Sequence, residues 1–233
     1  MSVNEPSSAQ TTSDREIEAE RLLNQGNQLF QVSKYREAFA VWEKSLQIYR
    51  EIKDRNGEGG LLNNLGNAYY SLGQYELSIN YYQECLIIAR RIGERQREGA
   101  ALGNLGNAYY GLKQYKAALD FYQQHLTITR EIGDLQGEST ALGNLGISYL
   151  SLGQYERGLE YNLQRLNIAK TMGDRVSEAE ALLNLTLMYQ CTGSVELASE
   201  CCQQALSLAT ELGIPLAKEC EKLNQQLQDI DVR

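Results

Sequence analysis

Residues 101–140, ALGNLGNAYYGLKQYKAALDFYQQHLTITREIGDLQGEST, decide the fold, because the chain repeats this stretch with changes about five times. Two residue types mark the period of 40: Gly26, Gly66, Gly106 and Gly146, and Asn24, Asn64, Asn104, Asn144 and Asn184. A fixed period of about 20 to 50 residues is typical of repeat arrays, in which each unit buries its apolar face by stacking on its neighbours. The period therefore predicts a tandem array.

Each repeat is predicted to be a pair of antiparallel helices. In residues 59–98, apolar or small residues recur at helical steps in two runs: Leu62, Leu65, Tyr69 and Leu72, then Tyr75, Ser78, Tyr82, Leu86 and Ala89. Gly73 separates the runs and Gly93 follows the second, as expected of a glycine that closes a helix in the left-handed conformation. An acidic residue comes next, and it is Asp134 or Asp174 in later repeats. Asp at this place is typical of a helix N-cap.

Two glycines fall in the middle of predicted helices. Gly66 and Gly106 each cost about 1 kcal/mol there relative to Ala. Without a Cβ, however, the second helix of the pair can pack directly against the backbone. The small residues Ser78 and Ala118 on the second helices fit the same contact. We therefore expect close packing at both glycines.

The same period defines the expected domain organisation. Residues 1–14 are polar and without periodicity, so we interpret them as a disordered tail. The array is expected over 15–218, with repeats at about 19–58, 59–98, 99–138, 139–178 and 179–218. Residues 216–229 have one apolar and one polar helical face, which predicts a capping helix that closes the stack.

The motif residues resemble the tetratricopeptide repeat: Leu102, Leu105-Gly106 and Tyr109 on the first helix, then Tyr115, Ala118 and Tyr122 on the second. The words NLGNAY and IGD…GE are similar to the longer variety of this repeat found in kinesin light chains, Pins-type adaptors and bacterial, including cyanobacterial, arrays. The resemblance covers roughly 19–218. It implies an all-α, right-handed solenoid superhelix of five helix pairs, whose first helices line a concave groove. It implies a scaffold for protein interactions and names no client.

The predicted groove wall carries rows of asparagine among small residues, flanked by tyrosines. An Asn side chain offers the same donors and acceptor as a peptide unit, so such a row can hold the backbone of an extended peptide. Arrays of the Pins and kinesin-light-chain type use such Asn residues in this way, by resemblance. The expected peptide-binding residues are Asn24, Asn27, Asn64, Asn67, Tyr70, Asn104, Asn107, Tyr110, Asn144, Ile147, Asn184 and Leu187.

Alternatives stay open at this point. The Asn rows could instead bond to neighbouring helices and set the angle between repeats. Ile147 and Leu187 replace Asn in the second row, so the last two repeats should prefer an apolar ligand residue. Tyr81, Phe121 and Tyr161 either form an exposed aromatic strip or pack against the next repeat. Asn162 replaces the aromatic residue of repeat four, whose helix pair we expect to be looser.

Composition excludes several classes of function. The chain of 233 residues has a net charge of −8, which argues against nucleic acid and anionic membranes as partners. Apolar runs are too short for a membrane span and no secretory signal is visible, so a cytoplasmic location is expected. Arg55, Arg95, Arg97 and Arg175 are interpreted as solvated turn charges that could rim the groove. Of the five cysteines, Cys85, Cys202 and Cys220 fall on apolar faces and are interpreted as small buried hydrophobic residues.

No catalytic or metal-binding pattern appears in the sequence. The lone histidine, His125, occupies a position whose residue type varies among repeats, so we expect it to be partly exposed and without catalytic function. No cofactor, metal or enzyme activity is predicted. The sequence favours an adaptor that binds an extended segment of a protein or peptide partner. The alternative is a self-assembling scaffold or assembly factor, a homo-oligomer that acts through its convex face or array ends.

Overall fold

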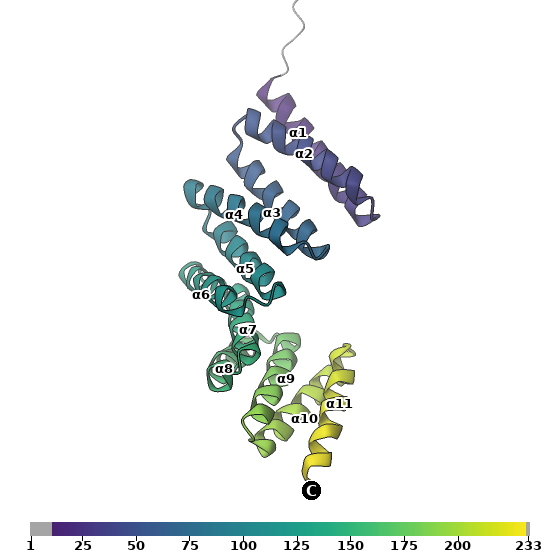
Figure 1. Cartoon of the computed structure of the whole chain (residues 1–233), viewed down its shortest axis with the longest axis vertical. Coiled ribbons are helices and arrows are strands. Elements are labelled where there is room, and N and C mark those ends of the chain that lie inside the picture. The colour runs from purple at the N-terminus through teal and green to yellow at the C-terminus, as the bar shows by residue number, and fades with distance from the viewer. Residues whose placement is uncertain (1–10, 232–233) are drawn as a thin grey trace, which may run out of the picture. The chain divides into compact units, whose positions relative to one another are not determined.

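The computed structural model describes residues 11–231, and in this range the chain forms eleven helices and no strand (Figure 1). The helices are α1 Thr12–Gln31, α2 Tyr35–Glu51, α3 Arg55–Ser71, α4 Tyr75–Ile92, α5 Arg95–Gly111, α6 Tyr115–Ile132, α7 Leu135–Ser151, α8 Tyr155–Met172, α9 Arg175–Cys191, α10 Val195–Leu212 and α11 Leu216–Asp231. Odd-numbered helices up to α9 are the first helices of the repeats, and the even-numbered helices are the second. The all-α solenoid prediction is confirmed.

The chain divides into two compact units, residues 1–104 and 105–233, with the boundary inside α5. We call them the N-terminal and C-terminal units, and each is described by itself.

The first helix begins earlier than expected. Thr11 is its N-cap: the Thr11 side chain accepts from the Asp14 backbone N–H at 3.1 Å, and the Asp14 carboxylate accepts from the Thr11 backbone N–H at 3.0 Å. This reciprocal pair is a capping box, which satisfies two N–H groups that a helix start otherwise leaves open. The array was expected from residue 15, and the helix starts at Thr12. Residues 1–10 of the predicted tail lie outside the described residues.

The turns follow the predicted chemistry. Gly73 and Gly93 have φ of +72° and +76°, the left-handed region that glycine enters without a steric cost. Ser33, Lys53 and Lys113 take the same conformation at turns without glycine, with φ of 61°, 60° and 59°. The Asp caps are also confirmed, since Asp54 accepts from the backbone N–H groups of Asn56 and Gly57 at 3.0 Å.

The mid-helix glycines lie under aromatic rings. A Cβ built on Gly66 would lie 2.4 Å from Cε1 of Tyr82, and one on Gly106 would lie 2.4 Å from the same atom of Tyr122. Both rings are buried. Close approach is therefore confirmed, and the group that makes it is the flat face of the second-helix aromatic residue.

Three aromatic residues of the second helices, Tyr81, Phe121 and Tyr161, stack on a tyrosine of their own repeat. The rings of Tyr69 and Tyr81 are 5.2 Å apart and inclined by 8°, and those of Tyr149 and Tyr161 are 5.5 Å apart at 6°. Phe121 stacks in the same way on Tyr109. Tyr81, Phe121 and Tyr161 are therefore partly buried and do not form an exposed strip, because the first-helix tyrosine covers one face of each ring.

A buried ion pair joins consecutive repeats in the N-terminal unit. The Glu58 carboxylate accepts from Arg50 Nε at 2.8 Å and from Arg55 Nη1 at 2.6 Å, and its side chain is 5% exposed. Glu98 repeats this contact with Arg90 and Arg95. Burial would raise the pKa of Glu58, but the hydrogen bonds from the two arginines hold this pKa below its ordinary value. Arg55 and Arg95 are thus ion-paired at a repeat junction, beyond the solvated role expected of them.

The same junction is weaker in the C-terminal unit. Glu138 pairs with Arg130 at 2.7 Å, and Leu135 stands where the second arginine would be. At the next junction Lys170 lies 3.9 Å from Glu178, and both side chains are more exposed.

Helix α11 covers one side of α10. Cys220, Leu223 and Leu227 form its buried stripe, and they pack with Cys202 in one apolar cluster. The Cys202 thiol donates to the Cys220 carbonyl at 3.5 Å. Cys85, Cys202 and Cys220 are buried, which confirms them as small core residues. Over the described helices, none is both long and apolar enough to cross a membrane.

Candidate functional site

Three of the predicted groove residues meet on the face formed by the first helices of the N-terminal unit. Asn27 of α1 and Asn64 and Asn67 of α3 line one pocket of about 400 Å³, with Trp42 at its edge. Asn64 also lines a neighbouring pocket together with Asn63 and Arg97. Asn24 is exposed on α1.

Asn67 connects the groove wall to its own hairpin and to the next repeat. The Tyr82 hydroxyl donates to Asn67 Oδ1 at 2.8 Å. Asn104 Nδ2 donates to the same oxygen at 3.3 Å and to Asn63 Oδ1 at 3.0 Å. The predicted ligand residues are therefore also structural, because one end of each amide is used to hold helices together.

The C-terminal unit repeats this arrangement once. The Tyr122 hydroxyl donates to Asn107 Oδ1 at 2.8 Å, and Asn144 Nδ2 donates to that oxygen at 3.3 Å. Two donors occupy both lone pairs of the Asn67 and Asn107 carbonyls. These bonds do not use the amino groups of Asn67 and Asn107. They also do not use the side-chain oxygens of Asn104 and Asn144. Each unit thus has one Asn pair in which one amide keeps a donor and the other keeps an acceptor.

The first repeat uses a different ring for the same bond. Trp42 Nε1 donates to Asn27 Oδ1 and to the Leu23 carbonyl, both at 3.2 Å. Trp42 is buried, so the core role predicted for it is confirmed.

The last two repeats lose this pair of residues together. In repeat four, Ile147 replaces the wall Asn, and Asn162 replaces the aromatic ring. Asn162 is fully buried and donates to the Gly158 carbonyl at 3.2 Å. It also accepts from Asn184 Nδ2 at 3.3 Å. These bonds hold Asn162 within α8 and to α9, and the looser packing expected of the pair α7–α8 stays a prediction. Asn184 is 9% exposed, and this bond to Asn162 occupies its amino group.

The remaining predicted residues of these repeats do come together. Asn144, Ile147, Asn184 and Leu187 line a pocket of about 550 Å³ bounded by α7, α9 and α11. We call it the C-terminal pocket. Pockets of about 300 to 1,000 Å³ are the size that holds small ligands or side-chain groups.

The tyrosines Tyr70 and Tyr110 lean on the turn tyrosines of the following helices. Their ring centroids lie 5.3 Å from Tyr75 and 5.2 Å from Tyr115. The Tyr110 hydroxyl is 3.0 Å from Ser151 Oγ of the next first helix. Both tyrosines keep part of their surface open to solvent.

Sequence reasoning missed Arg165 as a wall residue. It belongs to second helix α8, yet its side chain crosses Gly143 of α7, where an added Cβ would lie 3.1 Å from Arg165 Cδ. Arg165 pairs with Glu180 of α9 and lines the C-terminal pocket. Gly143, which leaves space for a long side chain from the partner helix, was the available signal. Arg97 likewise lies over Gly59, and it donates to Asn56 Oδ1 at 2.8 Å.

His125 is not partly exposed as expected. It is 8% exposed, and its Nδ1 has no hydrogen-bond partner among the described residues. Burial lowers the pKa of His125, and Asp134 opposes this in part. The residues at the same place in other repeats, Ser45, Cys85 and Ala205, are fully buried too. This position of the second helix is buried in these repeats, and a different side chain fills it in each, which explains why the residue type varies.

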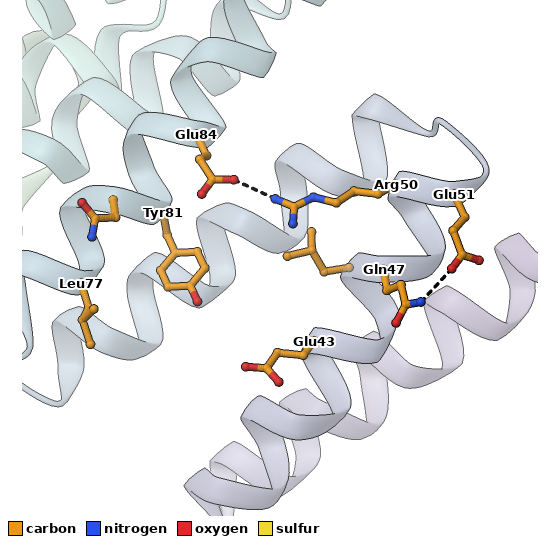
Figure 2. A pocket seen from close by; sticks show the side chains of 9 residues that line it. Glu43, Gln47, Arg50, Glu51, Leu77, Tyr81 and Glu84 are labelled. Carbon is orange, nitrogen blue, oxygen red and sulfur yellow. Dashed lines mark hydrogen bonds and ion pairs between the residues drawn. The ribbon is translucent and has the colours of Figure 1, made fainter.

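A further pocket, of about 720 Å³, lies on the opposite, second-helix side of the N-terminal unit (Figure 2). Figure 2 shows Leu77 and Tyr81 of α4 facing α2 across it. Arg50 donates to Glu84 at 2.7 Å and Gln47 donates to Glu51 at 2.8 Å, so its polar walls largely bond to one another. Over the described residues, no group of three or more His, Cys, Asp or Glu side chains could hold a metal ion.

Tandem helix hairpins with interlocking wall residues define an α-solenoid repeat protein. The family model for the tetratricopeptide repeat matches residues 18–86 and 58–131. The chain is a tetratricopeptide-repeat protein. No curated protein sequence matches it.

Solved structures agree with this fold at low sequence identity. A signal-transduction ATPase with a tetratricopeptide-repeat sensor from Pyrococcus horikoshii is 19% identical with a TM-score of 0.86, covering 94% of this chain and 34% of its own. A putative kinesin light chain from Podospora anserina is 18% identical with a TM-score of 0.72, covering 85% of this chain and 97% of its own. A Rap protein complexed with competence and sporulation factor is 18% identical with a TM-score of 0.66, covering 95% and 67%. At these identities the likeness concerns the fold alone, and the chain spans about a third of the ATPase.

Proposed function

We propose that the protein is an interaction adaptor that holds an extended segment of a partner protein against its first-helix wall. The observation that carries the proposal is the orientation of the wall amides. Tyr82 and Asn104 saturate the carbonyl of Asn67, which leaves its amino group for a ligand, and the amide of Asn104 faces the opposite way. An amide donor next to an amide acceptor matches the C=O and N–H groups of an extended backbone.

Preorganisation strengthens this argument. An amide that is already held by its own hairpin loses little conformational freedom when a ligand binds, so more of the interaction appears as affinity. A Rap protein of the same fold has been solved in a complex with competence and sporulation factor, and the Pyrococcus array is described as a sensor. Both are consistent with a wall that receives a ligand. We propose binding, and not catalysis, as the activity of the chain.

The test measures binding of unstructured peptides from a random twelve-residue library to the full chain by fluorescence anisotropy. Asn64→Ala and Asn144→Ala should each raise Kd roughly three- to tenfold, as expected when a hydrogen bond is lost. Gln83→Ala, exposed on second helix α4, is the control and should leave Kd unchanged. Equal Kd for all variants would refute the wall as the binding face.

A second pair of variants tests the role of amide orientation. Tyr82→Phe removes the hydroxyl that donates to Asn67 and leaves the wall surface unchanged. We expect this variant to fold normally and to bind peptides more weakly. Tyr81→Phe changes the neighbouring residue, whose ring stacks on Tyr69, and should bind normally. If both variants bind equally, amide orientation is irrelevant.

The alternative is self-assembly through the ends of the array. The observation in its favour is the exposure of Ile17 and Val32, 62% and 65%, at the outermost described helix. Concentration-dependent light scattering of wild type and of Ile17→Ser/Val32→Ser tests it. Mass that grows with concentration in the wild type alone would support the scaffold.

A further inference from the structure

The C-terminal pocket differs in chemistry from the wall of the N-terminal unit. Its apolar lining consists of Ile147 of α7, Leu183 and Leu187 of α9, and Leu216 of α11. Two of these, Ile147 and Leu187, stand where the earlier repeats place Asn. The pocket therefore keeps polar amides at one side, Asn144 and Asn184, and offers an aliphatic surface on the other.

The charges of the pocket are not balanced at its mouth. Arg165 is its cation, but this side chain is 11% exposed and its Nη2 is paired with Glu180. Glu180 is 46% exposed, and Glu219 in the first turn of α11 is exposed as well. The pocket lining thus has one more acid than base, and both carboxylates are more accessible than the guanidinium.

The comparable pocket of the N-terminal unit lacks this bias. Its lining carries one acid, Glu94, and one base, Arg97. Gly57, Gly60 and Ala100 leave its surface small and the amides of Asn63 and Asn64 accessible along it. Leu23, Tyr49 and Leu61 also line this pocket, so the two pockets differ in their charge and not in the presence of an apolar surface.

We propose that the C-terminal pocket selects the partner, and that it takes an aliphatic side chain of an extended segment in which a neighbouring residue is Lys or Arg. The proposal rests on the proposed function and adds the class of segment to it. Burial of an aliphatic group against Ile147 and Leu187 supplies affinity. The carboxylates of Glu180 and Glu219 attract a basic neighbour and repel an acidic one, which favours specificity and association rate.

The experiment is position-by-position selection from a library of extended twelve-residue peptides by the full chain. Wild type should enrich Leu, Ile or Val beside Lys or Arg, and the affinity of a selected peptide should fall as salt rises. Ile147→Asn restores the residue type of earlier repeats and should lose the aliphatic preference but keep the basic one. On the selected peptide we expect a loss of about tenfold, the order for one buried aliphatic group.

Charge reversal at an exposed residue provides a second variant, whose fold is checked by circular dichroism. Glu219 is exposed on α11, so Glu219→Lys should fold normally and shift the selected neighbour from basic toward acidic or neutral residues. Asn64→Ala in the other unit is the matched control and should weaken all peptides alike without changing the selected pattern.

The outcomes separate this inference from the proposed function. Enrichment of acidic residues by the wild type, or an unchanged pattern in both Ile147→Asn and Glu219→Lys, overturns the inference. If Asn64→Ala still weakens binding in that case, the proposed function stands. If the wild type binds no peptide from the library, both are overturned.

Discussion

In hairpins α1–α2 and α3–α4, an aromatic ring of the second helix lies on a glycine and donates to an Asn on the wall. In hairpins α7–α8 and α9–α10, Asn162 and Cys202 occupy the place of the ring, and Ile147 and Leu187 occupy the wall. The ring and the wall Asn are replaced together because the N–H or O–H of the ring donates its hydrogen bond to the side-chain oxygen of that Asn. Changing the hairpin core therefore changes the surface offered to a ligand.

The junctions between repeats differ in the same sense. Glu58 is buried between two arginines, whereas Glu178 has a single lysine at 3.9 Å. A buried carboxylate with two charge-assisted hydrogen bonds contributes more stability than a loose surface pair. The comparison indicates that the carboxylates with two arginine partners lie at the N-terminal junctions.

The largest expected effect tests the contact of ring and glycine. Gly66→Ala should destabilise the N-terminal unit by about 3 kcal/mol, because the buried Tyr82 ring has no room to move and its bond to Asn67 is lost with it. Gly60→Ala lies in the same helix with nothing within 4 Å of its new Cβ. It should stabilise by up to about 1 kcal/mol. Urea unfolding measures both, and equal effects would show that the ring contact does not matter.

The next effect compares two junctions. Glu58→Gln should lower the free energy of unfolding by about 2 kcal/mol, because two arginines lose a buried partner. This figure is reduced for solvent screening, since both arginine side chains are about half exposed. Glu178→Gln should cost less than about 1 kcal/mol. Hydrogen exchange of α3 and α9 amides measures each locally. A larger loss of protection after Glu178→Gln than after Glu58→Gln would contradict the expected difference between the two junctions.

Acid should affect the two units in different pH ranges. The pKa of Glu58 is lowered in the folded state, so its stabilisation is present above about pH 4.5, the ordinary Glu pKa, and is lost as pH falls through the folded pKa. Burial lowers the pKa of His125 below 6.5, so the unfolded state takes up the proton first, and stability falls with pH from about 6.5 downward.

Thermal melts at pH 7.5 and 5.5 check this difference. The wild type should lose Tm at the lower pH, and His125→Leu should lose less. Glu58→Gln should retain the wild-type loss, since Glu58 is ionised at both values. A Tm that falls equally in His125→Leu would contradict the role of this histidine.

The smallest expected effect concerns a turn. Lys113 has φ of 59° at the place where Gly73 and Gly153 stand in neighbouring repeats. Lys113→Gly should stabilise by about 0.5–1 kcal/mol by removing the steric cost of the left-handed conformation, partly offset by chain entropy. Gly73→Lys is the converse, and differential scanning calorimetry should record opposite shifts in Tm.

The periodic features were predictable because they depend on local chain geometry. The spacing of Gly66 and Gly106, the Asp54 cap and the turn at Gly73 follow from helix geometry alone. What the amide of Asn107 bonds to was not predictable, since the answer depends on the Tyr122 hydroxyl from another helix. Arg165 was missed for the same reason, because its side chain lies over Gly143 of another helix and this is a tertiary contact.

Identical junctions have a consequence for how such a chain can grow. Glu58, which pairs with Arg50, directly precedes repeat two, and Glu98, which pairs with Arg90, is the last residue of repeat two. A duplicated copy of 59–98 inserted after residue 98 would therefore find a matching partner at both of its edges. A copy inserted after residue 178 would meet Asn162, Asn184 and a lone lysine, for which it has no counterparts. A duplicated repeat would therefore find matching junction residues on the N-terminal side and not on the C-terminal side.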